Sequence, residues 1–554
     1  MKKIIYCILL CLHTTVYGQI KFTNPILSGF YPDPSVTKVG KDYYLVNSTF
    51  SYFPGIPVFH SQDLKNWKQI GNVIERNSQM TFMGDRTSRG LFAPSINYHN
   101  GIYYITCTLI DHKGNFVVTA TDPAGPWSEP TWLPEVKGID PSLFFDGDKA
   151  YIVYNSDAPD NKPQYSGHRT IRTHQFDPLK LKVIGDEQIL VNGGVDISKK
   201  PVWIEGPHIF KRGQWYYLCA AEGGTSVNHS QVVLRSTKAT GPYVPYEKNP
   251  ILTQRDLAPN RPFPITSTGH AEMIEGPDGL TYAVFLAVRP YTGNFYNTGR
   301  ETFIAPVKWT DGWPVINPYS KEVKYEYSAN FKEVVPGNLV PQSGNFAYRT
   351  SFSEKIDPSL LFLRKNDSSW YKLDHNNGLI MNLKPETCME SGNPAFLGKR
   401  QQHMACSATT DMSFTAKAEN EKAGIMIFRG EYNFYFMCKS SDKEKQVIQL
   451  YKGNKSTSSM ELIKQEFLLG AGSELELKID ARAALYDFKY RQKGKTWKIL
   501  KTDVDGKYLS TEAAGGFIGS LFALYATSSG KQSDSRASYK WLDYSGDDSR
   551  FKPK

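Results

Sequence analysis

A pattern of apolar and polar positions recurs five times in the first half of the chain. Each copy begins with a polar or small residue, continues through a short apolar run, turns near a glycine and ends in a second apolar run such as Tyr43–Val46. Apolar runs on both sides of a glycine turn predict a β-hairpin. The five copies begin at Asp33, Ala93, Asp140, Glu205 and Gly269.

The spacing of these hairpins indicates how they are assembled. Their first residues lie roughly 45 to 65 positions apart, the interval expected when each repeat forms one four-stranded propeller blade. A third apolar run follows each hairpin, at Val58–Ser61, Phe116–Thr119, Thr170–Thr173, Val232–Arg235 and Thr302–Ala305. We therefore predict a five-bladed β-propeller over residues 19–330. An ordinary β-sandwich with chance Asp-Pro turns is the alternative.

The second half of the chain alternates apolar and polar residues but lacks the repeated pattern. Its clearest runs are Met412–Ala416, Gly424–Phe428, Tyr432–Phe436, Leu475–Ile479 and Leu521–Tyr525. We predict a concanavalin-like β-sandwich over residues 345–554. A chain of 554 residues is longer than one hydrophobic core usually supports. The segment Tyr325–Phe346 follows neither period and is expected to be a linker, so the whole chain is predicted to be all-β.

The N-terminus carries two lysines, an apolar stretch over Ile4–Leu12 and a small residue at Gly18. This arrangement is typical of a secretory signal peptide over residues 1–18. We expect an exported protein, periplasmic or extracellular, with no membrane association after cleavage. The cysteines beyond the signal are Cys107, Cys219, Cys388, Cys406 and Cys438. Their odd number and irregular spacing indicate neither a disulfide framework nor a zinc site, so buried free thiols are expected.

The charge of the chain decides little about its substrate. The formal net charge of +10 is scattered over both halves, without a basic run. We therefore expect no nucleic-acid partner. The sequence gives no indication of the oligomeric state.

Three of the repeats begin with a carboxylate, at Asp33, Asp140 and Glu205, and we expect these three residues to occupy equivalent positions in their blades. The innermost strands of a propeller converge on its axis, so these side chains are expected to meet over one pocket. Neighbouring carboxylates repel one another, and at least one should keep its proton near neutral pH. A protonated and an ionised carboxyl group are the pair that hydrolysis of a glycosidic bond requires. Any one such motif alone is more often a turn.

The chain resembles glycoside hydrolase family 43, in its two-domain group of β-xylosidases and α-L-arabinofuranosidases. The matching stretches are Tyr31–Ser35, Ser48–Gly55, Phe92–Pro94, Ile139–Ser142, Ile204–Pro207, Ala221–Thr225, Thr268–His270, Gly299–Phe303 and Phe396–His403. The resemblance implies a propeller enzyme with an inverting mechanism that requires no cofactor. Asp33 would be the general base, Glu205 the general acid, and Asp140 the carboxylate that tunes and orients the acid.

The resemblance also implies residues that contact the sugar. Arg289 would bind sugar hydroxyls, with an ion pair that closes the fifth blade as the alternative. Thr225 belongs to one of the matching stretches. The aromatic candidates for packing on the sugar, each with core packing as the alternative, are Phe50, Phe53 and Phe92. The family commonly has a tryptophan where Phe92 stands, which leaves the shape of the first subsite open.

In the fifth repeat, His270 occupies the position that a carboxylate occupies in the first, third and fourth repeats. In family members such a histidine often contacts a central water or calcium ion, and a histidine held by hydrogen bonds near the axis is the alternative. The sequence shows no set of acidic residues that could be recognised as calcium ligands. A central calcium ion near His270 and a histidine without a metal are therefore both left as expectations.

The second domain has two interpretations. It is either a separate carbohydrate-binding module or, as in the resembling group, a domain that inserts a loop to close one side of the pocket. Phe517 is the candidate for the tip of that loop, with a place in the sandwich core as the alternative. A closed wall would admit only a chain end and so predicts an exo-acting enzyme.

The function expected from these features is release of terminal non-reducing α-L-arabinofuranosyl or β-D-xylosyl residues from plant hemicellulose or its oligosaccharides. The departure at Phe92 favours the arabinofuranosyl sugar slightly. A non-catalytic sugar-binding propeller and an endo-acting arabinanase are the alternatives. The motifs of related five-bladed fructosidases are absent from the sequence.

Overall fold

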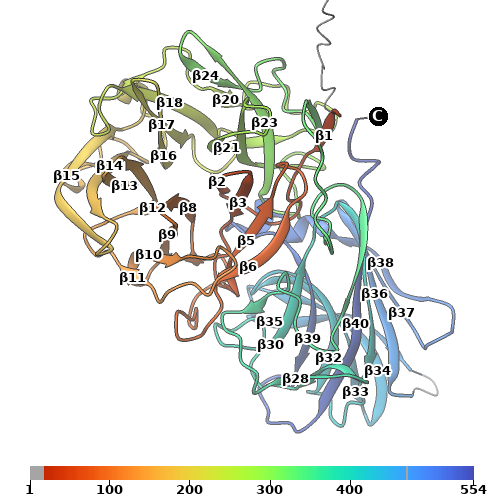
Figure 1. Cartoon of the computed structure of the whole chain (residues 1–554). Coiled ribbons are helices and arrows are strands. Elements are labelled where there is room, and N and C mark those ends of the chain that lie inside the picture. The colour runs from red at the N-terminus through yellow and green to blue at the C-terminus, as the bar shows by residue number, and fades with distance from the viewer. Residues whose placement is uncertain (1–17, 469–471, 554) are drawn as a thin grey trace, which may run out of the picture.

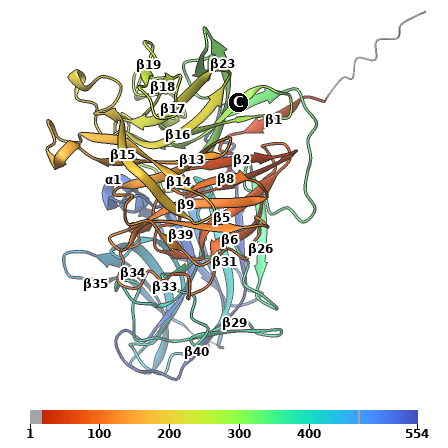
Figure 2. The ribbon, with the colours of Figure 1, turned by 60° about the vertical axis from the view of Figure 1, so that its left-hand side comes forward.

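The computed structural model describes residues 18–468 and 472–553. It consists of two all-β domains packed side by side (Figures 1 and 2). Within these ranges, helical structure is confined to α1 (Thr511–Ala514), η1 (Pro159–Asn161), η2 (Ile197–Lys199) and η3 (Gly506–Leu509). The predicted signal peptide lies almost entirely outside the described residues.

The first domain is the predicted five-bladed propeller, whose blades surround one axis (Figure 1). Blade 1 contains β2 (Ser35–Val39), β3 (Asp42–Val46), β5 (Gly55–Ser61) and β6 (Lys68–Ile74). Blade 2 contains β7 (Gly90–Leu91), β8 (Ser95–His99), β9 (Ile102–Ile110), β10 (Gly114–Ala120) and β11 (Thr131–Trp132). Blade 3 contains β12 (Ile139–Asp146), β13 (Lys149–Asp157), β14 (Arg169–Asp177) and β15 (Lys182–Asn192).

The last two blades complete the ring. Blade 4 contains β16 (Glu205–Arg212), β17 (Trp215–Glu222), β18 (Ser230–Ser236), β19 (Val244–Pro245) and β20 (Leu252–Thr253). Blade 5 contains β21 (Thr266–Glu275), β22 (Thr281–Val288), β23 (Glu301–Thr310) and β24 (Trp313–Ile316). Each predicted hairpin forms the two inner strands of its blade, and each predicted third run is the next strand outward.

The two ends of the propeller meet in a separate pair of strands. Antiparallel strands β1 (Ile20–Thr23) and β25 (Glu326–Ala329) join residues that are about 300 positions apart. Strand β25 falls inside the segment expected to be a linker, so the connection between the domains begins after Ala329. The linker prediction placed this boundary a few residues too early because β25 is too short to show a period.

The second domain is a sandwich of an eight-stranded and a six-stranded sheet. The larger sheet contains β26 (Phe346–Ser351), β28 (Tyr371–Asp374), β29 (Gly378–Asn382), β31 (Ala405–Ser413), β36 (Glu474–Arg482), β37 (Leu485–Arg491), β38 (Lys498–Asp505) and β40 (Arg536–Gly546). The smaller contains β30 (Ala395–Arg400), β32 (Lys422–Gly430), β33 (Asn433–Asp442), β34 (Lys445–Asn454), β35 (Ser459–Phe467) and β39 (Leu521–Thr527). Alternating apolar residues such as Ile425, Leu477 and Phe522 fill the space between them.

The two domains are joined by backbone pairing as well as by side chains. Strand β4 (Tyr52–Phe53) of the propeller pairs with β27 (Phe362–Leu363), which lies between β26 and β28 in the second domain. Next to it, the buried guanidinium of Arg364 contacts Glu431, whose carboxylate also accepts hydrogen bonds from Thr87 in the propeller. The sandwich is therefore docked firmly on blades 1 and 2.

The five cysteines beyond the predicted signal peptide are free and buried, as expected. Burial raises the pKa of each of their thiols. Among the helices of the described residues, none combines the length and the apolar character needed to cross a bilayer.

Candidate active site

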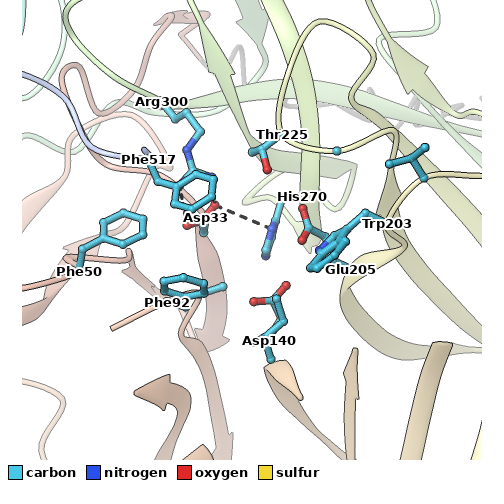
Figure 3. A pocket seen from close by; sticks show the side chains of 14 residues that line it. Asp33, Phe50, Phe92, Asp140, Trp203, Glu205, Thr225, His270, Arg300 and Phe517 are labelled. Atoms are coloured by element: carbon cyan, nitrogen blue, oxygen red, sulfur yellow. Dashed lines mark hydrogen bonds and ion pairs between the residues drawn. The ribbon is translucent and has the colours of Figure 1, made fainter. Parts of the chain in front are cut away.

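A cavity of about 340 Å³ lies where the innermost strands of the propeller begin. All three predicted carboxylates, Asp33, Asp140 and Glu205, line it (Figure 3). Its remaining walls are mostly apolar and come from all five blades and from one loop of the sandwich. The convergence predicted from the repeat is confirmed.

The same backbone conformation recurs at the start of four innermost strands. Asp33, Asp140 and His270 have φ of 52°, 55° and 52°, and Gly206 has φ of 56°. The position equivalent to the two aspartates is therefore Gly206, and Glu205 lies one residue before it. A Cβ at Gly206 would come within 2.8 Å of the His270 ring, so only glycine fits there. The predicted equivalence of the three carboxylates is thus wrong by one residue in blade 4.

Asp33 is held as an anion by its neighbours. Arg300 Nη1 donates to its Oδ1 at 2.7 Å, and Ser48 Oγ donates to its Oδ2 at 2.6 Å. Burial alone would raise the pKa of Asp33, but the Arg300 guanidinium and the other polar neighbours outweigh it, so the pKa lies below its ordinary value. Asp33 is therefore ionised at neutral pH.

The pKa values of Glu205 and Asp140 are shifted in the opposite direction. Burial, together with the negative charges of Asp140 and Asp33, raises the pKa of Glu205 well above its ordinary value. Burial and the charge of Asp33 raise the pKa of Asp140 to about 7, although the Gly206 N–H donates to its Oδ2 at 3.1 Å. The cavity thus combines one ionised carboxylate with a protonated carboxyl group, as general base and acid catalysis require.

His270 lines the same cavity. Its Nδ1 lies 3.9 Å from Asp33 Oδ1, and burial lowers its pKa to about 3, so the imidazole is neutral. No cluster of three or more histidine, cysteine or acidic side chains in the described part of the chain is arranged to hold a metal ion. Calcium prefers six to eight oxygen ligands, and both Asp33 oxygens already accept hydrogen bonds. The residues around His270 therefore do not fit calcium.

Three phenylalanines form an aromatic wall on one side of the cavity (Figure 3). The ring of Phe517 is stacked on Phe50 at 6.1 Å between centroids and meets Phe92 edge-on at 6.0 Å. Phe517 comes from the sandwich, in the loop between α1 and β39, so the second domain does supply a wall of the cavity. Thr225, from the loop after β17, lines the opposite side.

Two predicted sugar contacts lie elsewhere. Phe53 does not line the cavity; it is 1% exposed and is paired with Phe362 between the domains. Arg289 is also buried away from the cavity lining, and its guanidinium donates to Glu301 at 2.6 and 2.8 Å and to Asp548 at 2.8 Å. The alternative interpretations, core packing and an ion pair of blade 5, hold for these two residues.

Among the lining residues that were not predicted from the sequence, Arg300 and Trp203 have the largest side chains. Arg300 stands in the matching stretch Gly299–Phe303, directly before β23, where alternate side chains point in opposite directions. It faces the cavity, and its neighbour Glu301 faces Arg289. Trp203 stands two residues before Glu205. An aromatic residue so close to a candidate acid was the available signal.

Comparison with known proteins bears on both domains. The family model described as "Glycosyl hydrolases family 43" matches residues 22–314. A second model, described as "Beta xylosidase C-terminal Concanavalin A-like domain", matches residues 349–545. The division into domains that these models imply agrees with the sheets described above.

Individual relatives cover nearly the whole chain. A protein of Butyrivibrio fibrisolvens named "Xylosidase/arabinosidase" is 37% identical, over 94% of this chain and 98% of its own length. A Bacteroides ovatus protein named "Non-reducing end alpha-L-arabinofuranosidase BoGH43B" is 34% identical, over 95% of each chain. The solved structure described as "Bacteroides ovatus Xyloglucan PUL GH43B" has a TM-score of 0.83 at 32% identity, over 95% of this chain and 99% of that chain. The chain belongs to glycosyl hydrolases family 43 and is a glycosidase.

Proposed function

We propose that the protein is an exo-acting, inverting glycoside hydrolase that releases terminal non-reducing α-L-arabinofuranosyl or β-D-xylosyl residues from plant hemicellulose or its oligosaccharides. One observation carries the proposal. Asp33 is ionised and Glu205 keeps its proton within a single cavity. That pair is what hydrolysis of a glycosidic bond needs.

The mechanism follows from these two ionisation states. Asp33 accepts a proton from a water molecule as the water attacks the anomeric carbon. Glu205 donates its proton to the departing glycosidic oxygen, so that the aglycone leaves as a neutral alcohol. Asp140, next to Glu205, raises the pKa of the acid through its negative charge. A single displacement of this kind inverts the anomeric configuration.

The exo-acting mode is supported by the shape of the cavity. About 340 Å³ is at the small end of ligand-binding pockets. The wall formed by Phe50, Phe92 and Phe517 closes one side of it. A polymer could not pass through such a site, whereas a chain end could enter it. An endo-acting arabinanase is therefore not favoured.

The identity of the released sugar is tested by direct assay. The two relatives described above are named as a xylosidase/arabinosidase and an arabinofuranosidase. The phenylalanine at position 92, where the family commonly has a tryptophan, slightly favours arabinofuranosyl release. Nitrophenyl α-L-arabinofuranoside and nitrophenyl β-D-xyloside should both be offered, and the faster one names the sugar. Release from neither would contradict the proposed function and favour a sugar-binding propeller.

The roles of the two carboxyl groups are separable by mutation. Asp33→Ala and Glu205→Ala should each abolish turnover of natural oligosaccharides while the fold, followed by circular dichroism, stays intact. Glu205→Ala should lose less activity on a substrate with a good leaving group, which needs little protonation. Retention of more than a few per cent of the activity on natural oligosaccharides by either variant, or an NMR time course with retained anomeric configuration, would overturn the assignment.

We infer export to the periplasm or the medium from the predicted signal peptide alone. Cell fractionation with an antibody against the sandwich tests it. Recovery of the full-length, uncleaved chain in the cytoplasm would contradict it. The mechanism above uses no metal or cofactor.

A further inference from the structure

A second hollow, of about 430 Å³, lies where blade 5 meets the last residues of the sandwich domain. Residues 259–264, just before β21, and residues 290–293, just after β22, form its propeller side. Thr266 at the start of β21 pairs with Val288 at the end of β22. The innermost strands begin at the cavity, so this hollow opens at the same end of the propeller as the active site.

The lining of the hollow is rich in flat apolar groups. It contains three aromatic rings and four prolines: Phe263, Tyr291, Phe551, Pro259, Pro262, Pro264 and Pro290. Phe263 is 39% exposed, and its backbone is in the left-handed region at φ of 48°. A large aromatic side chain held at the surface in this conformation is available for stacking against a ligand.

The charge of the lining has one sign. Arg261 and Arg550 are its charged residues, and none of the described residues that line it is acidic. Arg261 is occupied, because it donates to the carbonyls of Ala258 and Ile265 and lies 3.7 Å from Glu322. The side chain of Arg550 makes no hydrogen bond or ion pair within the described part of the chain. Its guanidinium is free to bind an anion.

The hollow has a rigid base. Next to its lining residues in the chain, Arg289 Nη1 and Asp548 Oδ2 are 2.8 Å apart and both residues are buried. Arg289 precedes Pro290, and Asp548 lies two residues before Arg550. Both sides of the hollow are therefore fixed to one buried ion pair. Because the backbone on both sides is fixed before a ligand binds, no loop has to be ordered on binding.

We propose that this hollow is a second carbohydrate-binding site that takes a sugar unit carrying a carboxylate, such as a uronosyl branch. The apolar face of the sugar ring packs on Phe263 and its aromatic neighbours, and the carboxylate pairs with Arg550. A uronosyl unit satisfies both features at once, whereas a neutral sugar uses only the aromatic face. The choice of hemicellulose as the source of this unit rests on the proposed function.

The proposal is tested by binding in solution with the hydrolytically inactive Glu205→Gln protein. The probes are xylotetraose and xylotetraose with a single glucuronosyl branch, titrated by calorimetry. The branched probe should bind about fivefold more tightly at low salt, as expected of one partly exposed ion pair. That preference should shrink at high salt, because exposed charges are screened. Equal affinity for the two probes would overturn the proposal.

Two further substitutions locate the site. In the same inactive background, Arg550→Gln should remove the preference for the branched probe, and Phe263→Ala should weaken its binding. Arg255→Gln and Tyr319→Ala are the matched controls, because they alter an exposed arginine and an exposed aromatic ring outside the hollow. A preference that survives both test substitutions would place the binding elsewhere.

Failure of this proposal is distinguishable from failure of the proposed function. With Glu205 intact, Arg550→Gln should hydrolyse the nitrophenyl glycosides at the rate of the unmodified protein, since Arg550 does not line the catalytic cavity. A loss of that activity in Arg550→Gln would contradict a separate site. Inactivity of the unmodified protein would contradict the proposed function alone.

Discussion

Three carboxyl groups of the same kind share one cavity, and their neighbours decide which of them keeps its proton. Asp33 receives two hydrogen bonds from a guanidinium and a hydroxyl group. Glu205 instead faces the negative charges of Asp140 and Asp33 in a buried environment. Individual contacts therefore determine which carboxyl group acts as the base and which as the acid. Each contact can be tested by one substitution.

Replacing Arg300 should move the acidic limb of the pH profile. Burial raises the pKa of Asp33, and Arg300 provides the largest opposing effect. In Arg300→Gln the pKa of Asp33 should rise, so the base is protonated at a higher pH than before. The acidic limb of kcat/KM should shift to higher pH, with Arg255→Gln as the control. An unshifted limb would show that Arg300 does not set the ionisation of the base.

Replacing Asp140 should shift the alkaline limb of the pH profile of kcat/KM. The negative charge of Asp140 is the largest cause, after burial, of the raised pKa of Glu205. In Asp140→Asn that pKa should fall, so the acid loses its proton at a lower pH. The alkaline limb of kcat/KM should shift to lower pH. If it shifted upward or stayed in place, the role of Asp140 in holding the proton on Glu205 would be refuted.

At the scale of elements, one loop carries the sandwich into the active site. Helix α1 ends at Ala514, and Gly515 and Gly516, with φ of 69° and 70°, turn the chain toward Phe517. Arg429 donates to the Gly515 carbonyl, and the Phe517 N–H donates to Ser88 Oγ of the propeller at 3.2 Å. The position of Phe517 in the aromatic wall therefore depends on two glycines and on one contact between the domains.

The two glycines form a matched pair for a test of this loop. A Cβ at Gly516 would lie 2.3 Å from Ser88 Oγ, whereas a Cβ at Gly515 would meet nothing within 4 Å. Both glycines have a positive φ, so both substitutions to alanine strain the backbone; Gly515, with ψ of −167°, lies in a region almost restricted to glycine, where the strain is about 1 to 3 kcal/mol. Only the substitution at Gly516 adds a clash with the propeller. Gly516→Ala should therefore lower kcat/KM on nitrophenyl glycosides by about tenfold or more, equivalent to at least about 1.4 kcal/mol. Gly515→Ala should change it much less.

Relief of the clash provides the control. Ser88→Gly removes the atoms that a Cβ at position 516 would meet. Adding Ser88→Gly to Gly516→Ala should restore part of the lost activity. Equal losses in Gly515→Ala and Gly516→Ala, without recovery in the double variant, would show that the position of Phe517 does not control the cavity.

The sequence predicted features that depend on residues close together in the chain or on the repeat, and it missed features that depend on residues far apart in the chain. The hairpins and the meeting of Asp33, Asp140 and Glu205 depend on local patterns and on a repeat, and both are confirmed. Arg289 and Arg300 lie on one connection, and the choice between them depends on Asp548, which is 259 positions from Arg289. No local pattern could indicate that contact. The pairing of Phe53 with Phe362 was beyond the sequence for the same reason.

At the scale of the whole molecule, the active site exists only when the two domains are docked. The pairing of β4 with β27, the hydrogen bonds from Thr87 to Glu431, and the ion pair of Arg289 with Asp548 all hold the sandwich in place. Phe517, the part of the sandwich that lines the cavity, depends on that docking. Stability of the interface and activity should therefore be lost together.

Asp548 offers the sharpest test of this dependence. Its Oδ2 accepts from Arg289, and its Oδ1 accepts from the backbone N–H groups of Met404 and Ala405 at 2.8 and 3.0 Å. Asp548→Ala leaves the buried Arg289 with Glu301 alone and two N–H groups without their acceptor. Removing one partner of a buried ion pair costs about 3 to 5 kcal/mol, so the free energy of unfolding should fall by that order.

Chemical denaturation, followed by fluorescence and by hydrolysis of a nitrophenyl glycoside, measures both consequences. Activity should disappear at a lower denaturant concentration in Asp548→Ala, together with the loss of structure. The control is Lys552→Ala, which removes an exposed ion pair to Glu326 at 3.9 Å in the same C-terminal segment. That change should stay within about 0.5 kcal/mol. If Asp548→Ala were as stable as the control, the buried ion pair would not be what holds the catalytic cavity together.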